Sequence, residues 1–304
     1  GGRERGGTGS GGAGVAGRSS AGTGGIGSHI DTVRNAGRYD GTLGVVLGIA
    51  AAAQTRSSAL PFALEVVGFT DEEGARFGTH FLASRAYLDG VVSGRDRERQ
   101  DAEGIALATV LPNVTAKSSV SPGRGCPPDV LGYLEIHIEQ GPVLDSRALP
   151  LGVVTEIAGQ ATGTVSFDGV PGHAGTVPMS QRHDALCAAA ELVMWIEDTA
   201  RETRGLLGTV GEIAASPGAR TGLPSHATVG VDLRTPAGAA RPEGAPRLAP
   251  RADLIARERG IRVSHASFNV HDPVACDPTH AGVLADAVRS TGYEPMLITS
   301  GAGH

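Results

Sequence analysis

Histidine and acidic side chains recur in this chain at the ends of apolar, strand-like runs. His29 and Asp31 flank the end of the run that closes at Ile30, and a second run over 62–69 is followed by the acidic segment 71–73. A helix-forming, alanine-rich stretch lies between the two runs. Strands that alternate with helices predict an α/β sheet, in which functional groups gather at the carboxyl ends of the strands. This pattern therefore predicts an α/β fold with imidazole and carboxylate groups at strand ends.

The order of the expected elements also predicts the domain organisation. Residues 1–25 are almost only Gly, Arg, Ser, Thr and Ala, which predicts a disordered or ill-defined start. The stretch 159–271 reads strand-helix-strand-strand-helix-strand, which predicts a small α+β domain. The segments on either side of it, 26–158 and 272–304, both show the alternation of strands and helices. We therefore expect a discontinuous α/β domain with a mixed sheet and flanking helices, into which 159–271 is inserted. Residues 93–130 are expected to form an irregular surface connection.

Composition narrows the class of protein. The 304 residues are 40% hydrophobic, which allows a substantial core, and carry a formal net charge of −6 with no basic stripe. This argues against a nucleic-acid partner. No apolar run is long enough to cross a membrane. The three cysteines, Cys126, Cys187 and Cys276, form no CxxC pair. They predict reduced thiols in a cytoplasmic protein, with a catalytic cysteine as the lesser alternative.

The polar motifs predict a site for two metal ions. His29 can offer one imidazole nitrogen to a metal, and Asp31 is placed to hold the other nitrogen and orient the ring. Asp40, beside a glycine, can bridge two ions through its two oxygens. Of the adjacent carboxylates Glu72 and Glu73, one can bind metal while the other acts as general base.

Three further histidines and one arginine extend this hypothesis. His137 and His304 would complete the coordination of the two metals. His173, between small residues, is either an ordinary loop histidine or a group approached by a ligand or another chain. Arg234 ends a strand and either pairs with a local carboxylate or clamps a substrate carboxylate. Each motif alone is weak, whereas the ordered set is specific.

Five segments carry a resemblance to a known family: GSHIDTVRNAGRYDG, FTDEEGARFG, LEIHIEQGPVL, GHAGTVPMSQRHDAL and SGAGH. They resemble the amidase branch of the M20 metallopeptidase superfamily, which holds N-carbamoyl-L-amino acid hydrolases, allantoate amidohydrolases and beta-ureidopropionases. The match runs from about Gly27 to His304. The long GRYDG and HIEQGP motifs distinguish this branch from the peptidases of the superfamily.

The resemblance implies two divalent metal ions per subunit (zinc, manganese or cobalt) and a lid domain over 159–271 that also forms a homodimer. The implied metal ligands are His29, Asp40, Glu73, His137 and His304, with Asp40 bridging. Glu72 would be the general base. His173 would enter the partner subunit's active site and stabilise the developing oxyanion. Gln140 and Arg234 would contact a small carbamoyl or ureido acid substrate, Arg234 at its carboxylate.

The chain also departs from the family pattern. The family's first helices are absent, and the chain stops on His304, so the resemblance implies a catalytic domain truncated at both ends. Thr221 stands where the family has an asparagine that contacts substrate. We expect a metal-dependent amidohydrolase that cleaves a linear amide C–N bond of an N-carbamoyl-L-amino acid or allantoate, by attack of a metal-bridged hydroxide with Glu72 as base. The alternatives are a dipeptidase or aminoacylase of the same superfamily, or an inactive fragment.

Overall fold

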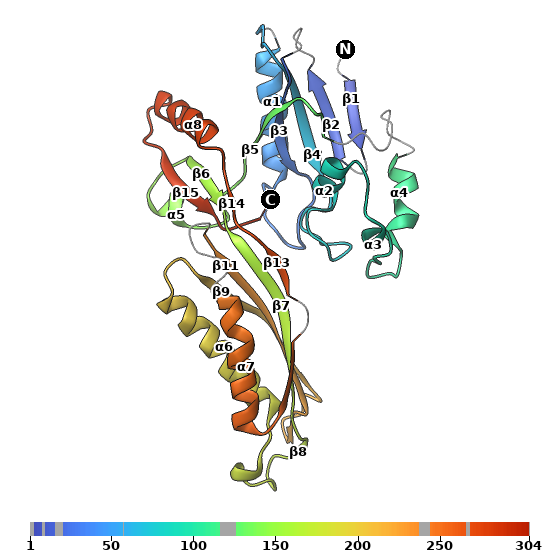
Figure 1. Ribbon diagram of the computed structural model, residues 1–304, viewed down its shortest axis with the longest axis vertical. Helices are drawn as coiled ribbons and strands as arrows, with labels where there is room; N and C mark the ends of the chain where they lie inside the picture. Colours follow the sequence, from blue (N-terminus) through green and yellow to red (C-terminus); the bar gives the residue numbers. More distant parts are fainter. Residues whose placement is uncertain are drawn as a thin grey trace. The chain divides into compact units, whose positions relative to one another are not determined.

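The computed structural model has two compact units, one extending to residue 140 and the other spanning residues 141–303. Each is considered by itself (Figure 1). The described residues are 3–7, 10–15, 21–56, 58–115, 126–236, 244–265 and 268–303. Among these residues, no helix is both long and apolar enough to cross a membrane.

The first unit is built on a five-stranded mixed sheet with the order β1-β2-β4-β3-β5. Its strands are β1 (Arg3–Gly7), β2 (Ser10–Val15), β3 (Thr23–His29), β4 (Ala63–Phe69) and β5 (Val130–Glu135). Strand β3 lies between β4 and β5 and runs parallel to both, while β2 is antiparallel to β1 and β4. The predicted mixed α/β sheet is therefore present. Because β3, β4 and β5 are parallel, their carboxyl ends open at the same edge.

Two parts of the first unit differ from the sequence prediction. The glycine-rich start was expected to be disordered, whereas the structure describes strands β1 and β2 there. Sheet ladders are made by backbone N–H and C=O groups, so a segment poor in apolar side chains can still pair. The stretch 93–130 was expected to be irregular, yet it begins with helices α3 (Gly94–Arg97) and α4 (Leu107–Thr115).

The helices of the first unit pack around small cores. Helix α1 (Thr42–Thr55) packs on β3 and β4, where Ile26, Ala52 and Val66 are buried together. Helix α2 (Leu82–Asp89) shares a separate cluster with α4. That cluster consists of Phe77, Leu82, Ala86, Val92 and Leu107. The first unit thus has no single large core among its described residues.

The second unit contains a larger antiparallel sheet with the order β12-β7-β11-β9, in which β13 also pairs with β7. Its strands are β7 (Gly159–Asp168), β9 (Leu207–Ser216), β11 (His226–Thr235), β12 (Arg262–His265) and β13 (Asn269–His271). Buried residues alternate along β7 and β11, as expected for a sheet covered on one face. The stretch 159–271 begins with β7 and ends with β13. That this stretch is an inserted domain stays a prediction.

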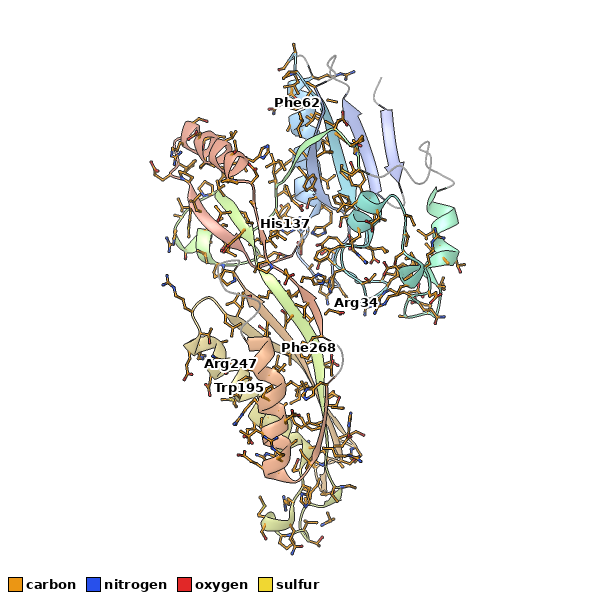
Figure 2. All side chains as sticks on the ribbon, viewed as in Figure 1. Arg34, Phe62, His137, Trp195, Arg247 and Phe268 are labelled. Atoms are coloured by element: carbon orange, nitrogen blue, oxygen red, sulfur yellow. The ribbon has the colours of Figure 1, made fainter. Side chains whose placement is uncertain are left out.

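Two helices, α6 (Ala185–Glu202) and α7 (Gly244–Arg259), lie side by side on this sheet (Figure 1). Asp184 caps α6 by accepting hydrogen bonds from the backbone N–H groups of Leu186 and Cys187. The helices and the sheet enclose an extended core whose largest fully buried members include Phe167, Leu192, Leu248 and Ile255. Trp195 and Phe268, labelled in Figure 2, are partly buried against it.

The remaining elements of the second unit are small. A three-stranded sheet has the order β14-β6-β15. Its strands are β14 (Val274–Ala275), β6 (Gly152–Ile157) and β15 (Met296–Ser300), with helices α5 (Val143–Ser146) and α8 (Pro278–Ser290) nearby in sequence. A two-stranded pair joins β8 (Gly172–His173) to β10 (Gly222–Leu223), and a short 3₁₀ helix spans Met179–Gln181. The sequence assigned 141–158 and 272–304 to the catalytic domain, whereas the structure groups 141–158 and 272–303 with the second unit. Their catalytic assignment stays a prediction.

Candidate metal centre

Glycine packing brings Asp40 against the end of β3. His29 is the last residue of β3 and is 2% exposed, and Asp40 is 5% exposed. Gly41 has a φ of 68°, and a Cβ built on it would overlap the His29 ring. A Cβ on Gly44 would likewise overlap the carbonyl oxygen of Ile136. Only glycine lets the start of α1 approach the strand ends this closely, because its backbone takes a positive φ and carries no side chain.

The two buried imidazoles share one protonation pattern. The Nδ1 atom of His29 lies 2.6 Å from the carbonyl oxygen of Asp31, and that of His137 lies 2.8 Å from the carbonyl oxygen of Ile138. A carbonyl can only accept a hydrogen bond, so each Nδ1 carries the hydrogen in the neutral ring. Both Nε2 atoms therefore present lone pairs, the form that binds a metal.

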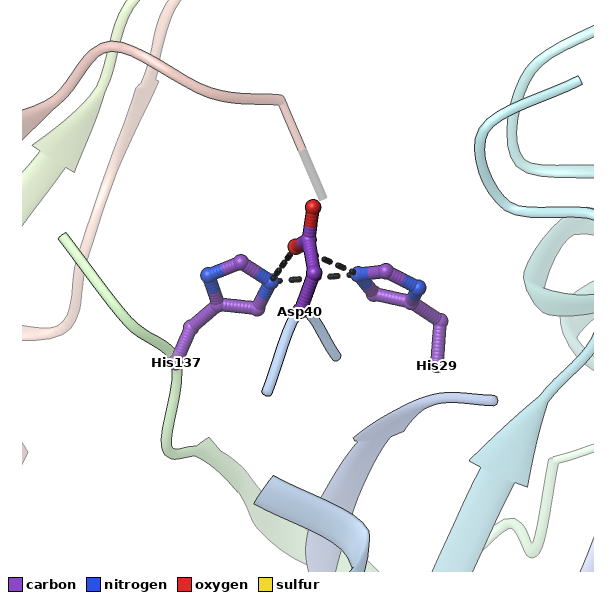
Figure 3. Close-up of side chains that lie close together, drawn as sticks. All are labelled: His29, Asp40 and His137. Carbon is purple, nitrogen blue, oxygen red and sulfur yellow. Dashed lines mark hydrogen bonds and ion pairs between the residues drawn. The ribbon is translucent and has the colours of Figure 1, made fainter. Parts of the chain in front are cut away.

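The two Nε2 atoms converge on Asp40, as Figure 3 shows. The two Nε2 atoms are 3.1 Å apart, and Asp40 Oδ1 lies 3.3 Å from that of His137 and 3.9 Å from that of His29. Lone pairs that face each other and a carboxylate repel unless a cation lies among them. Two nitrogens bound to one zinc at about 2.0–2.1 Å would be about 3.3 Å apart at the tetrahedral angle. The donor set therefore fits a divalent metal ion.

A second possible ligand group adjoins the first. His29, Glu72 and Glu73 each offer an atom within 4.8 Å of the others. The backbone N–H groups of Glu72 and Glu73 donate to the Asp31 carboxylate at 3.1 and 3.2 Å. Asp31 was predicted to orient the His29 ring through its side chain. The structure shows its backbone carbonyl in that position, while its carboxylate fixes the turn that carries the two glutamates.

Several carboxyl groups lie close together at this centre. Burial raises the pKa of Glu72 to about 8, and the charges of Glu73 and Asp31 act in the same direction. Burial also raises the pKa of Glu73, helped by Asp40 and opposed by His29. Buried carboxylates that repel one another in this way favour a bound cation.

Sequence reasoning missed a further, partly buried carboxyl group near these residues. Glu135 ends β5 and accepts a hydrogen bond of 2.7 Å from the Ser28 hydroxyl, beside His29. Burial raises the pKa of Glu135, and the Ser28 hydrogen bond opposes part of this rise. A signal was available, since Glu135 stands two residues before His137. Strand β5 ends at Glu135, so His137 lies in the segment that follows.

Gln140 and His304 are two other predicted site residues. The Nε2 of Gln140 lies 3.0 Å from both oxygens of Asp40, and its predicted contact with substrate stays a prediction. Its backbone has a φ of 54°, a conformation found at functional sites more often than elsewhere. His304, the expected fifth ligand, lies outside the described residues.

The expected oxyanion donor lies in the second unit, where the structure brings it beside Thr221. His173 in β8 pairs with Gly222 in β10, and the Thr221 carbonyl accepts a 2.8 Å hydrogen bond from the backbone of Ala174. The Gly175 N–H donates to His173 Nδ1 at 3.1 Å. In the neutral ring Nε2 must then carry the hydrogen, so the exposed His173 can donate to a negatively charged oxygen.

Arg234 lies near the carboxyl end of β11, whereas β10 precedes the amino end of that strand. Its Nε and Nη2 donate to the Asp232 carboxylate at 3.2 and 2.8 Å, and its Nη1 donates to the carbonyl oxygen of Gly301 at 2.6 Å. Arg234 thus forms a local ion pair, and its side chain is still 32% exposed.

Comparison with known proteins agrees with this geometry. A model of peptidase family M20/M25/M40 matches residues 25–304. The chain is 37% identical over 287 residues to an N-carbamoyl-L-amino acid amidohydrolase of Geobacillus stearothermophilus, covering 92% of this chain and 69% of that protein. It is 36% identical over 313 residues to an allantoate deiminase of Arabidopsis thaliana, covering 92% of this chain and 59% of the relative.

A solved structure also resembles this chain over its whole length. A hydantoinase/carbamoylase-family amidase from Burkholderia multivorans superposes with a TM-score of 0.86 at 30% sequence identity, over 100% of this chain and 74% of that one. The family match, the two relatives and the fold agree. This chain belongs to peptidase family M20/M25/M40 and, within it, to the hydantoinase/carbamoylase branch of amidohydrolases, which act on carbon–nitrogen bonds of linear amides other than peptide bonds.

Proposed function

We propose that this chain forms the metal-dependent core of an amidohydrolase that hydrolyses an N-carbamoyl-L-amino acid or allantoate. The observation that carries the proposal is the convergence of the Nε2 atoms of His29 and His137 on Asp40, beside Glu72 and Glu73. The substrate class follows the names of the relatives, which span more sequence than this chain.

The proposed ligands divide between two ions. His29, Asp40 and His137 would hold one, and Asp40, Glu73 and His304 would hold the other. Zinc, manganese and cobalt all accept this mixture of imidazole and carboxylate ligands. When bound, the ions supply a Lewis acid for the substrate carbonyl and lower the pKa of the attacking water.

Glu72 is the proposed general base. It is buried, and its backbone N–H donates to the Asp31 carboxylate, so the turn that bears it is fixed. Glu72 would take the proton from the attacking water and deliver it to the leaving nitrogen. Glu73, whose backbone donates to the other oxygen of the same carboxylate, is free to serve the metal.

The second unit would supply substrate contacts. Arg234 would bind the substrate carboxylate. His173, reaching the partner subunit's site in a homodimer formed through 159–271, would donate its Nε2 hydrogen to the developing oxyanion. Gln140 and Thr221 are the other proposed substrate contacts. Threonine keeps a hydroxyl but lacks the amide of an asparagine, so Thr221 would affect substrate preference.

A matched pair of variants tests the roles of the two glutamates. Glu72→Gln should keep its metal content and lose roughly 10²–10⁴-fold in turnover. Glu73→Gln should lose bound metal as well. Metal content is measured by elemental analysis, and ammonia release is followed with allantoate and several N-carbamoyl-L-amino acids.

The same assay separates the alternatives. Dipeptides and N-acyl amino acids are included in the panel, with release of the free amino acid as the readout. A preference for these substrates would replace the proposed reaction with that of a dipeptidase or aminoacylase. Full turnover by Glu72→Gln would overturn the role of Glu72 as base.

A further inference from the structure

The guanidinium group of Arg234 is held by a neighbour on its own strand. Asp232 and Arg234 are two residues apart on β11, so their side chains leave the same face of the sheet. The Asp232 carboxylate accepts from both Nε and Nη2 of Arg234. Gln160, which stands opposite Arg234 on β7, donates from Nε2 to Asp232 Oδ2 at 3.0 Å. A chain of hydrogen bonds thus runs from Gln160 through Asp232 to Arg234.

We propose that Asp232 is a positioning residue that aims Arg234 at the carboxylate of the substrate. This inference rests on the proposed function, in which Arg234 is the carboxylate-binding group. Asp232 itself need not touch the substrate.

The hydrogen-bond geometry supports this role. A guanidinium has five N–H donors. The two on one edge of the group, from Nε and Nη2, donate to the Asp232 carboxylate. With that edge fixed, Nη1 faces outward, where it already meets an acceptor, the Gly301 carbonyl oxygen at 2.6 Å. The substrate carboxylate would compete with or join this oxygen at the outer edge.

Fixing the side chain in advance also favours binding. An arginine loses considerable rotamer freedom when it is immobilised by a ligand. Asp232 and Gln160 impose that order before substrate arrives. Arg234 is 32% exposed and Asp232 29% exposed, so the guanidinium is ordered and still reachable.

A purely structural ion pair makes a different prediction from a positioning role. If Asp232 only stabilises the sheet, its loss should lower stability and leave ligand selectivity unchanged. If it positions Arg234, its loss should weaken only those ligands that carry a carboxylate. Asparagine in place of Asp232 would present an N–H group to one donor of Arg234, so the fork could not form.

The experiment compares two ligands that differ in one group. Binding of N-carbamoyl-L-alanine and of its carboxamide is measured by calorimetry on the metal-loaded full chain, in a Glu72→Gln background that prevents turnover. Asp232→Asn should raise the Kd of the carboxylate ligand roughly tenfold and leave that of the carboxamide unchanged, because a charged hydrogen bond is lost only with the first.

Asp168→Asn is the matched control. Asp168 lies on β7 near the other end of the same strand pair and forms an ion pair with His226 at 2.8 Å. Its substitution should change neither Kd. Thermal melts followed by circular dichroism verify that each variant is folded. If Asp232→Asn does not fold, Gln160→Ala replaces it, with a smaller loss expected in the same ligand.

Each outcome decides between the possibilities. Equal weakening of both ligands, or no weakening, by the variant overturns the inference. The inference is also overturned if the protein with native Asp232 binds the carboxylate ligand no more tightly than the carboxamide. Carboxylate-selective binding that depends on Asp232, in a chain whose native Glu72 form turns over none of the proposed substrates, would support the inference and contradict only the proposed function.

Discussion

The two units of this protein organise their functional side chains in different ways. In the first unit, His29 and Asp40 are almost fully buried, and close backbone packing at Gly41 and Gly44 fixes their positions. In the second unit, His173 and Arg234 are partly or largely exposed, and hydrogen bonds at strand ends orient them. Metal ligands need a fixed geometry, whereas groups that meet a substrate must stay accessible.

The hydrophobic cores of the two units differ in the opposite direction, because the larger core lies in the second unit, where the functional side chains are more exposed. The described part of the second unit has one extended core between its sheet and two helices and one small cluster around Val153, while that of the first unit divides its buried apolar residues into small clusters only. The unit with the most constrained site therefore has less apolar packing to stabilise it. Polar networks and, under the proposed function, bound metal have to contribute more there.

The largest expected effect concerns the extended core. Phe167 is fully buried between the sheet and the helices, so Phe167→Ala should lower the free energy of unfolding by about 3–5 kcal/mol. Chemical denaturation measures this loss. Met179→Ala is the control, because Met179 is 77% exposed and its truncation should leave stability nearly unchanged. Equal effects of the two substitutions would contradict the assignment of the core.

A smaller effect is expected from replacing Gly41, a glycine that has no side chain with which to bind a metal. Gly41→Ala would place a methyl group against the His29 ring at a positive φ, displacing a ligand from Asp40. We expect metal affinity to fall by roughly 10–100-fold, the scale seen when groups that orient metal ligands are lost. Competition with a fluorescent chelator gives the affinity.

Gly37→Ala provides the matched control for that variant. Gly37 lies in the same loop, and a Cβ on it would meet no atom within 4 Å. Its metal affinity should equal that of the unchanged protein. Unchanged affinity in Gly41→Ala as well would show that glycine packing does not set the ligand geometry.

The smallest effect depends on pH and on a polar network of the first unit. Burial alone would raise the pKa of Asp96, but hydrogen bonds from Ser93, Arg85 and Arg99 outweigh it and hold the pKa below its usual value. A depressed carboxyl pKa stabilises the fold above about pH 4, and this stabilisation is lost as pH falls through the folded-state pKa. Asp96→Asn should therefore cost about 1–2 kcal/mol at pH 7 and much less near pH 3.

Urea denaturation at both pH values checks this dependence. The exposed ion pair of Arg201 with Glu197 in the second unit is the comparison, because solvent screens it. Glu197→Gln should give no measurable change at either pH. A pH-independent loss in Asp96→Asn would mean that packing, and not charge, explains the contribution of Asp96.

Much of the candidate site could be predicted from the sequence because the strands that carry it are parallel. His29 ends one such strand, the acidic turn at Glu72 and His137 follow two others, and parallel strands end at one edge. Asp40 was predicted from its place beside Gly41. The roles of Asp31 and Gln140 were less predictable, because a hydrogen bond to a carbonyl or a carboxylate depends on backbone angles that residue type does not reveal.

The sequence by itself determined the α/β alternation and the set of imidazole and carboxylate groups, because periodicity and residue chemistry are local properties. Only the tertiary structure decided which nitrogen of each histidine carries the hydrogen, which oxygen orients His29, and how Asp232 holds Arg234. Those features arise from contacts between atoms brought within about 3 Å by the fold, and hydrogen bonds at that range depend on direction as well as distance.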